Sequence, residues 1–80
     1  MTHELKTIQP YFDEVANGNK TFEIRKFDRD YKVGDFLKLM EWNMEGHFFT
    51  GNYRIKEVTY ILSDAYDFGL IDGYCILGLR

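Results

Sequence analysis

The sequence predicts a small α+β domain that is mainly β: a closed or nearly closed barrel of about five to six strands, with one short helix after the first strand. Several short segments alternate apolar and polar residues, which is the pattern of half-buried strands. One segment near the N-terminus carries helix signals at both ends. Eighty residues are enough for one domain, so we expect residues 1–80 to form a single unit.

The first strand and the helix are predicted at the N-terminus. Residues 3–8, HELKTI, alternate weakly and predict a short strand. Residues 9–19, QPYFDEVANGN, predict a short helix with one apolar stripe that can pack on a sheet. Pro10 suits the first helical position, and Gly18 can adopt the left-handed conformation that ends a helix.

Residues 21–26, TFEIRK, predict the second strand because apolar and polar side chains alternate cleanly. Phe22 and Ile24 share one face, which we expect to point inward. Lys20 stands at the entrance of this strand. The opposite face carries a hydroxyl, a carboxylate and a guanidinium in a row, from Thr21, Glu23 and Arg25.

Residues 27–35 predict a loop that ends in a turn at Gly34 and Asp35, before a strong strand at residues 36–42, FLKLMEW. A long strand follows at residues 53–62, and its apolar face changes part-way along. A bulge near Lys56–Glu57 would reconcile its two halves, whose apolar residues are Tyr53 and Ile55 on one face and Val58, Tyr60 and Leu62 on the other.

The last strand is predicted at residues 74–79, YCILGL, after a loop at residues 63–73. It is apolar on both faces, so we expect it to be central or covered. Cys75 within it is expected to be a buried small residue, not a nucleophile. Trp42 is expected in the core, whereas the isolated residues His3 and His47 are expected at the surface and predict no metal site.

Charge is unevenly distributed in this chain, whose formal net charge is −3. That balance argues against a non-specific nucleic-acid binder. Six of the ten Lys and Arg residues nevertheless lie between positions 20 and 38: Lys20, Arg25, Lys26, Arg29, Lys32 and Lys38. The segment from Glu57 to Asp72 holds four acidic residues and no Lys or Arg.

The composition also predicts the cellular compartment and whether the chain associates with a membrane. A single cysteine excludes a disulfide framework and fits a reducing, cytoplasmic environment. The N-terminus does not have the pattern of a signal peptide. No apolar run approaches the roughly 20 residues that a membrane-spanning helix needs, so we expect no membrane association.

The segment GNKTFEIR, residues 18–25, has the Gly-x-Lys-x-x-x-x-Arg spacing that is typical of ASCH domains, members of the PUA-like superfamily. The chain most closely resembles domain of unknown function 3850, a small family found mainly in bacteria and phages. The resemblance runs from HELK at the start through GNKTFEIRKFDRDYKVGD, LMEW and VTYIL to GLIDGY before the last strand. It implies a PUA-like pseudo-barrel with a helix after the first strand, in agreement with the pattern above.

The resemblance implies that RNA or a nucleotide binds in a cleft beside this motif. An arginine offers a planar fork of donors for a phosphate or a base edge, and a lysine offers a point charge. We therefore expect an RNA- or nucleotide-binding module with an anion-accepting cleft, without a metal or cofactor. Its expected binding residues are Lys20, Thr21, Glu23, Arg25, Lys26 and Arg29.

Three alternatives stay open at this point, and the oligomeric state is open in all of them. Some ASCH-like members resemble amidohydrolases that deacylate a modified cytidine with a lysine, a threonine and a glutamate. Lys20 matches that lysine, but Glu23 stands where those enzymes have threonine, with Thr21 beside the lysine instead. A protein-interaction module of mobile-element origin is the second alternative. The third is that these charges only pair with one another on a solvated surface.

Overall fold

The computed structural model describes all residues, 1–80, and confirms a small, mainly β domain with one helix after the first strand. The number of strands is five, at the lower end of the expected range. Their order along the chain, with one α-helix and one short 3₁₀ turn, is β1 (Thr2–Thr7), α1 (Tyr11–Ala16), β2 (Phe22–Lys26), β3 (Phe36–Asn43), β4 (Phe48–Leu62), η1 (Tyr66–Phe68) and β5 (Tyr74–Leu79).

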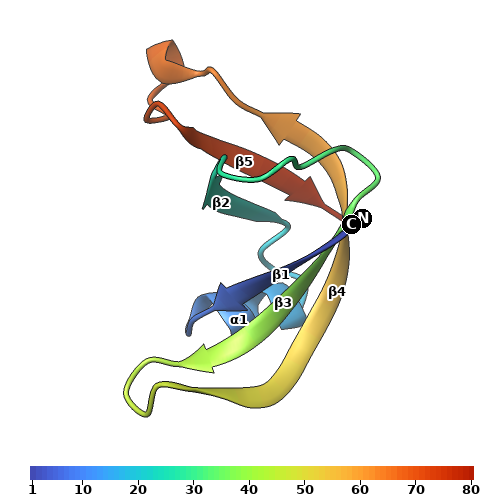
Figure 1. Cartoon of the computed structure of the whole chain (residues 1–80), viewed down its shortest axis with the longest axis vertical. Helices are drawn as coiled ribbons and strands as arrows, with labels where there is room; N and C mark the ends of the chain where they lie inside the picture. The colour runs from blue at the N-terminus through green and yellow to red at the C-terminus, as the bar shows by residue number, and fades with distance from the viewer.

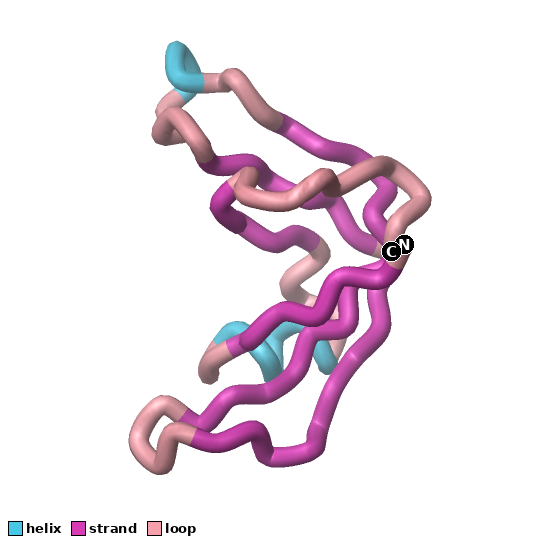
Figure 2. The backbone as a smooth tube through the Cα atoms, in the orientation of Figure 1, coloured by secondary structure: helices cyan, strands magenta, loops and turns pink.

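The five strands form one continuous sheet in the order β1-β3-β4-β5-β2. β1 pairs with β3 in parallel, and the other neighbouring strands are antiparallel. Figure 1 shows that the sheet curls, so that β1 and β2, its two edges, face the same opening. Figure 2 shows the loops at the ends of the strands. The fold is therefore barrel-like but open between β1 and β2.

The long strand β4 makes this curl, because it belongs to both halves of the sheet. Its first part pairs with β3 up to Glu57, and its last part pairs with β5 from Val58 onward. The register shifts between Val58 and Tyr60, close to the predicted bulge near Lys56–Glu57. After this bulge Ile61, and not Tyr60, packs against the core, because an extra residue reverses which side chains point inward.

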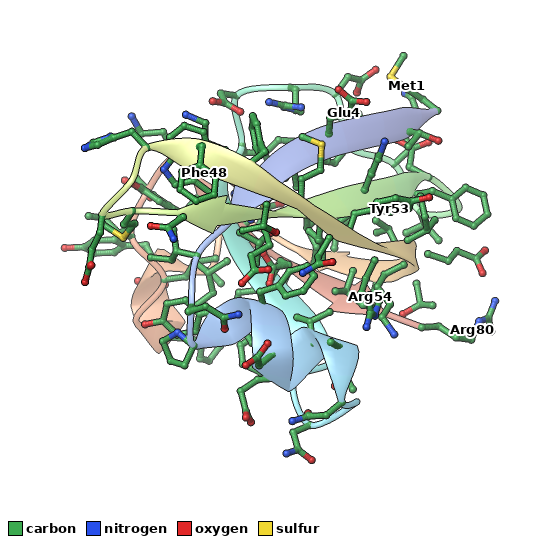
Figure 3. The ribbon with its side chains drawn as sticks, turned by 90° about the horizontal axis from the view of Figure 1, so that it is seen from below. Met1, Glu4, Phe48, Tyr53, Arg54 and Arg80 are labelled. Carbon is green, nitrogen blue, oxygen red and sulfur yellow. The ribbon has the colours of Figure 1, made fainter.

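The core lies inside the curl and is built from β1, β3, β4 and β5, the helix and the loop before β3. Its buried residues are Leu5, Val15, Tyr31, Leu37, Leu39, Val58, Cys75, Leu77 and Leu79. Figure 3, seen from below, shows α1 beneath the part of the sheet that contains β1, β3 and β4. Arg54, labelled there, faces this helix, with its guanidinium carbon 5.7 Å from the centre of the Phe12 ring.

The strand β2 has the predicted alternation but the opposite orientation. Glu23 is buried and Arg25 is half-buried, whereas Phe22 and Ile24 are exposed. In the register with β5, Glu23 lies opposite the buried residue Leu77. The expectation that the apolar residues point inward was therefore wrong. The physical reason is that β2 is an edge strand whose inner face borders the opening, where charged partners are within reach.

The loop between β2 and β3 closes one end of the barrel and overturns the expectation for His3. Tyr31 inserts into the core, and its ring lies 4.8 Å from the ring of His3, edge to face. His3 is buried, with Nε2 2.8 Å from Oδ2 of Asp35. An ionised carboxylate only accepts, so Nε2 carries the hydrogen in this contact. The His3 ring is thus part of the packed interior and not of the surface.

The structure also tests the predicted burial of Cys75 and Trp42. Cys75 is fully buried, as expected. Trp42 is only half-buried and lies outside the core, near the β3–β4 hairpin. Its ring packs edge to face on Phe49, with the centroids 4.8 Å apart, and the Lys6 ammonium lies 4.0 Å from its centre. The tryptophan therefore belongs to a small aromatic cluster at the surface.

Candidate functional site

A pocket of about 650 Å³ lies at the opening between the two edge strands. The end of β1 and α1 form one wall, and the turn after α1 together with β2 forms the other. Its lining consists of Thr7, Ile8, Tyr11, Glu14, Asn19, Lys20, Phe22, Glu23, Ile24 and Arg25. Three of the residues that the sequence singled out, Lys20, Glu23 and Arg25, therefore share one concave surface.

Glu23 is the central polar group of this pocket, and its side chain is only 4% exposed. The Lys20 ammonium donates to Oε2 of Glu23. The Arg25 guanidinium donates to Oε1 through Nε at 3.1 Å and through Nη2 at 2.8 Å. Because both carboxylate oxygens accept from a cation, the buried negative charge is compensated on both sides.

Arg25 also connects β2 to β1 across the opening. Its Nη2 donates to the main-chain oxygen of Lys6 at 2.8 Å and lies 3.3 Å from Oγ1 of Thr7. The backbones of β1 and β2 do not pair with each other. The guanidinium therefore supplies hydrogen bonds that a neighbouring strand would otherwise supply to the edge of β1.

Hydrogen-bond donors remain available on this cluster. Nη1 of Arg25 makes no hydrogen bond within the protein. Lys20 uses two of its three N–H groups, one on Glu23 and one on the main-chain oxygen of Phe22 at 2.7 Å. The side chains of Lys20 and Arg25 are 17% and 23% exposed, and both line the pocket. The pocket can thus donate to an acceptor-bearing ligand.

Aromatic rings stand beside these donors. The Lys20 ammonium lies 5.0 Å from the centre of the Phe22 ring and 5.7 Å from that of Tyr11. Both rings are about half exposed. Formal charges in the lining balance, with Lys20 and Arg25 against Glu14 and Glu23. The arrangement combines flat apolar surface with directional donors and has no excess of positive charge.

The other predicted site residues lie outside the lining of this pocket. Thr21 is exposed, and its main-chain oxygen accepts from the amide of Leu79 at 2.9 Å. Lys26 is exposed at the end of β2. Arg29, in the loop after β2, donates through Nη1 to the main-chain oxygen of Glu4 at 3.3 Å. Arg29 therefore bonds to the free edge of β1, two residues before the carbonyl that Arg25 contacts.

Sequence reasoning missed the wall formed by β1 and α1, including Thr7, Ile8 and Tyr11. Thr7 is buried at the end of an otherwise alternating strand, and no local pattern reveals that it faces Arg25. A signal for Tyr11 does exist, because it lies off the apolar stripe of the helix and is half exposed. In the structure its ring centre lies 5.7 Å from the Lys20 ammonium, and the residue lines the pocket.

A second polar cluster joins the helix to the β3–β4 hairpin, around Glu41. Its carboxylate accepts from Asn52 Nδ2 at 3.1 Å, from Gln9 Nε2 at 2.7 Å and from Thr50 Oγ1 at 2.8 Å. These three hydrogen bonds lower the pKa of Glu41, because they favour the ionised form. The three donors are neutral side chains, and through Gln9 the cluster ties the hairpin to the segment just before α1.

Comparison with known proteins assigns the chain to a family. A family model described as a domain of unknown function (DUF3850) matches residues 2–79. This chain belongs to that family. A relative from Escherichia phage P2, the uncharacterized 12.9 kDa protein in the GpA 3′ region, is 48% identical over 60 residues. The match covers 71% of this chain and 53% of the phage protein, so the chain spans about half the length of that curated relative.

The match to DUF3850 includes the whole pocket, whose lining runs from Thr7 to Arg25. The structure of this DUF3850 domain has no helix that is long and apolar enough to cross a bilayer. It also has no group of three or more His, Cys, Asp or Glu side chains placed to hold a metal ion. The Lys20–Glu23–Arg25 cluster is the part of the domain in which buried charge, free donors and a cavity coincide.

Proposed function

We propose that this domain is an RNA- or nucleotide-binding module of the ASCH-like, PUA-like kind, and that the pocket at Lys20 and Arg25 takes the ligand. The observation that carries the proposal is the position of the buried Lys20–Glu23–Arg25 cluster in the wall of a cavity of about 650 Å³. Cavities between about 300 and 1,000 Å³ are typical of small-molecule sites. A nucleoside or a mononucleotide falls within that class.

The available donors favour a base edge or a single phosphate over a polyphosphate. Glu23 already accepts from both cations, and Glu14 adds a further negative charge to the lining. The net field in the pocket is therefore weak, whereas the free N–H groups of Arg25 and Lys20 are directional. Paired donors of this kind recognise neighbouring acceptors on a base, or two oxygens of one phosphate.

The two rings favour a ligand that has a flat aromatic ring, such as a nucleobase. Phe22 and Tyr11 expose apolar surface beside the donors, and a base can stack on such rings with a gain of about 1–3 kcal/mol. A ligand that stacks there can present its edge to Arg25 while its ribose points to solvent. Recognition of unpaired RNA commonly combines stacking with hydrogen bonds to base edges in this way.

The test is a titration of isotope-labelled protein, followed by amide-resolved NMR, with mononucleotides, short single-stranded RNA and a hairpin RNA at two salt concentrations. The expected result is a set of shifts at Tyr11 and at residues 19–25, with only modest salt dependence. The variant Lys20→Gln should weaken binding several-fold. Lys32→Gln, on the exposed loop, is the control and should bind normally. No shifts with any of these ligands at millimolar concentration would refute the proposal.

A second candidate function is favoured by the direct contact between Lys20 and Glu23 in one pocket. In an amidohydrolase that acts on an acylated nucleobase, Glu23 would remove a proton from water as the water attacks the amide carbonyl. The Lys20 ammonium would stabilise the oxyanion. The amide C–N bond would then break as Glu23 returns this proton to the leaving nitrogen, and the products would be the free carboxylic acid and the amine. Incubation with N4-acetylcytidine should release cytidine and acetate, and Glu23→Gln should abolish the release if this function is correct.

A further inference from the structure

The outer face of β2, β5 and the end of β4 is an apolar surface that nothing in the chain covers. Cross-strand partners in a sheet lie on the same face. One row across this surface contains Phe22, Gly78 and Tyr60, and the next row contains Ile24, Ile76 and Leu62. Lys26 and Tyr74 form its outer edge. We call these eight residues the outer apolar face. Phe22 and Ile24 also line the pocket between β1 and β2, so a second copy and a stacked ligand would compete for these two side chains.

This face is distinguished by its composition, which is almost entirely apolar. Phe22, Ile24, Tyr60 and Leu62 expose 42%, 55%, 66% and 38% of their surface. The face contains one charged side chain, Lys26, and that residue lies at its margin. The outer side of β1, β3 and the first part of β4 also exposes apolar residues, including Tyr53 and Ile55, but the charged residues Lys6 and Lys38 interrupt it. A contiguous apolar patch without charges marks a contact with another protein surface.

We propose that the outer apolar face binds a second copy of this chain, face to face, as a weak two-fold dimer. The shape of the face supports this occupant. Gly78 leaves a dip between the rings of Phe22 and Tyr60, and Ile76 is the next outward residue on the same strand. A two-fold axis that runs between the sheets, across the strands and midway between these two residues, places Ile76 of each copy opposite Gly78 of the other.

The same axis matches the neighbouring rows. It places the aromatic residues Phe22 and Tyr60 of one copy opposite the aliphatic residues Ile24 and Leu62 of the other. A two-fold contact uses the same patch on both partners, so self-complementarity of this kind is what a dimer requires. The absence of charge at the centre means that no ion is buried without a partner, although each copy has a net charge of −3.

The exposed area of the outer apolar face sets the expected affinity of the dimer. With about 200 Å² for each side chain of this size, the exposed fractions provide roughly 400–500 Å² per copy. Two copies would bury about 800–1,000 Å², at the lower limit for a specific interface. We therefore expect dissociation constants on the order of 100 μM, and a monomer at low concentration. Salt should preserve or strengthen the dimer, because it screens the repulsion between two acidic copies.

The experiment is sedimentation equilibrium of the full chain from about 10 μM to 1 mM, at two salt concentrations. The wild-type protein is expected to shift from monomer to dimer over this range. Tyr60→Asp should move the midpoint at least ten-fold higher. Tyr53→Asp is a matched control, because it places the same charge on an exposed tyrosine of the same strand on the other side of the bulge, and it should leave the midpoint unchanged.

A second variant tests the position of the axis. A Cβ atom at Gly78 would lie no closer than 3.4 Å to its neighbours, so a side chain fits there within the monomer. Gly78→Val should fill the dip and weaken the dimer while far-ultraviolet circular dichroism stays unchanged. A wild-type chain that remains monomeric at 1 mM, a dimer that Tyr60→Asp leaves intact, or a dimer that Tyr53→Asp disrupts instead would each overturn the proposal. If the wild type stays monomeric, the outer apolar face would instead bind a different protein. In the other two cases the dimer interface would lie elsewhere on the chain.

Discussion

The guanidinium of Arg25 donates to the main-chain oxygen of Lys6 at 2.8 Å, across an opening over which the two edge strands share no backbone pairing. The same guanidinium holds the buried carboxylate of Glu23. Arg25 therefore bridges the open side of the barrel and lines the proposed binding pocket at the same time. Structural pairing and a place in the proposed binding pocket, which from the sequence look like alternatives for this residue, coexist in one side chain.

Glu23 is expected to stabilise the fold as well as the site. Glu23→Gln keeps the shape but removes the charge that Lys20 and Arg25 share, and leaves two partly buried cations facing a neutral amide. We expect the free energy of unfolding to fall by about 1–3 kcal/mol, less than for a fully buried pair because the cations are partly exposed. Urea denaturation measures this. Asp30→Asn, in the exposed pair with Lys32, is the control and should change little.

Arg25→Ala should destabilise the domain and also weaken ligand binding. It removes the bonds to Lys6 and Thr7 together with the pair to Glu23, so we expect a loss of about 2–4 kcal/mol in the free energy of unfolding. The double variant with Glu23→Gln should lose less than the sum of the single losses, because the two residues share one interaction. Strictly additive losses would show that the two side chains act independently.

The stability of the domain should fall at acidic pH through Asp35. The hydrogen bond from His3 lowers the pKa of Asp35 from 3.8 to about 2, and the bonds from the N-terminal ammonium and from the Lys32 amide act in the same direction. A carboxyl whose pKa is lower in the folded state stabilises the fold above its unfolded value. This contribution is therefore complete above about pH 5 and is lost between about pH 4 and pH 2.

The check is a comparison of thermal unfolding between pH 2 and pH 6 for the wild type and Asp35→Asn. The variant should be less stable at pH 6 and should show a shallower loss toward pH 2. Some acid dependence should remain, because Glu41 also has a lowered pKa, for which Asn52 and Gln9 are the main causes. Parallel curves for the two proteins would assign the acid sensitivity to other carboxyls.

Cys75 should be unreactive in the folded protein. It is fully buried, and burial raises the pKa of its thiol, so the reactive thiolate is both rare and shielded. A coloured disulfide reagent at pH 8 should modify the native chain at least a hundred-fold more slowly than the chain in urea. Rapid modification of the native protein would reveal local opening of β5, and modification at rising urea would report unfolding of the core.

Much of the architecture follows from local sequence patterns. The last strand has the predicted bounds, 74–79, and the helix lies after the first strand as expected. Gly18 and Gly34 have φ values of 85° and 96°, which glycine adopts readily. Gly18 follows the helix, and Gly34 lies in the turn before β3, as predicted for each. Three residues of the motif, Lys20, Glu23 and Arg25, line one pocket, because they are neighbours on one strand and at its entrance.

By itself, the sequence determined the order of strands, helix and turns and which residues alternate along most strands. It did not show that β4 begins at Phe48, five residues before the predicted start at Tyr53. Only the tertiary structure decided which face of β2 points inward, that His3 is buried against Asp35 and Tyr31, and that β1 and α1 complete the pocket. The reason is physical. Alternation defines two faces of a strand but not the neighbours of each face. For β2 the neighbours are β5, about 50 residues later, and the edge of β1, which Arg25 reaches through its side chain.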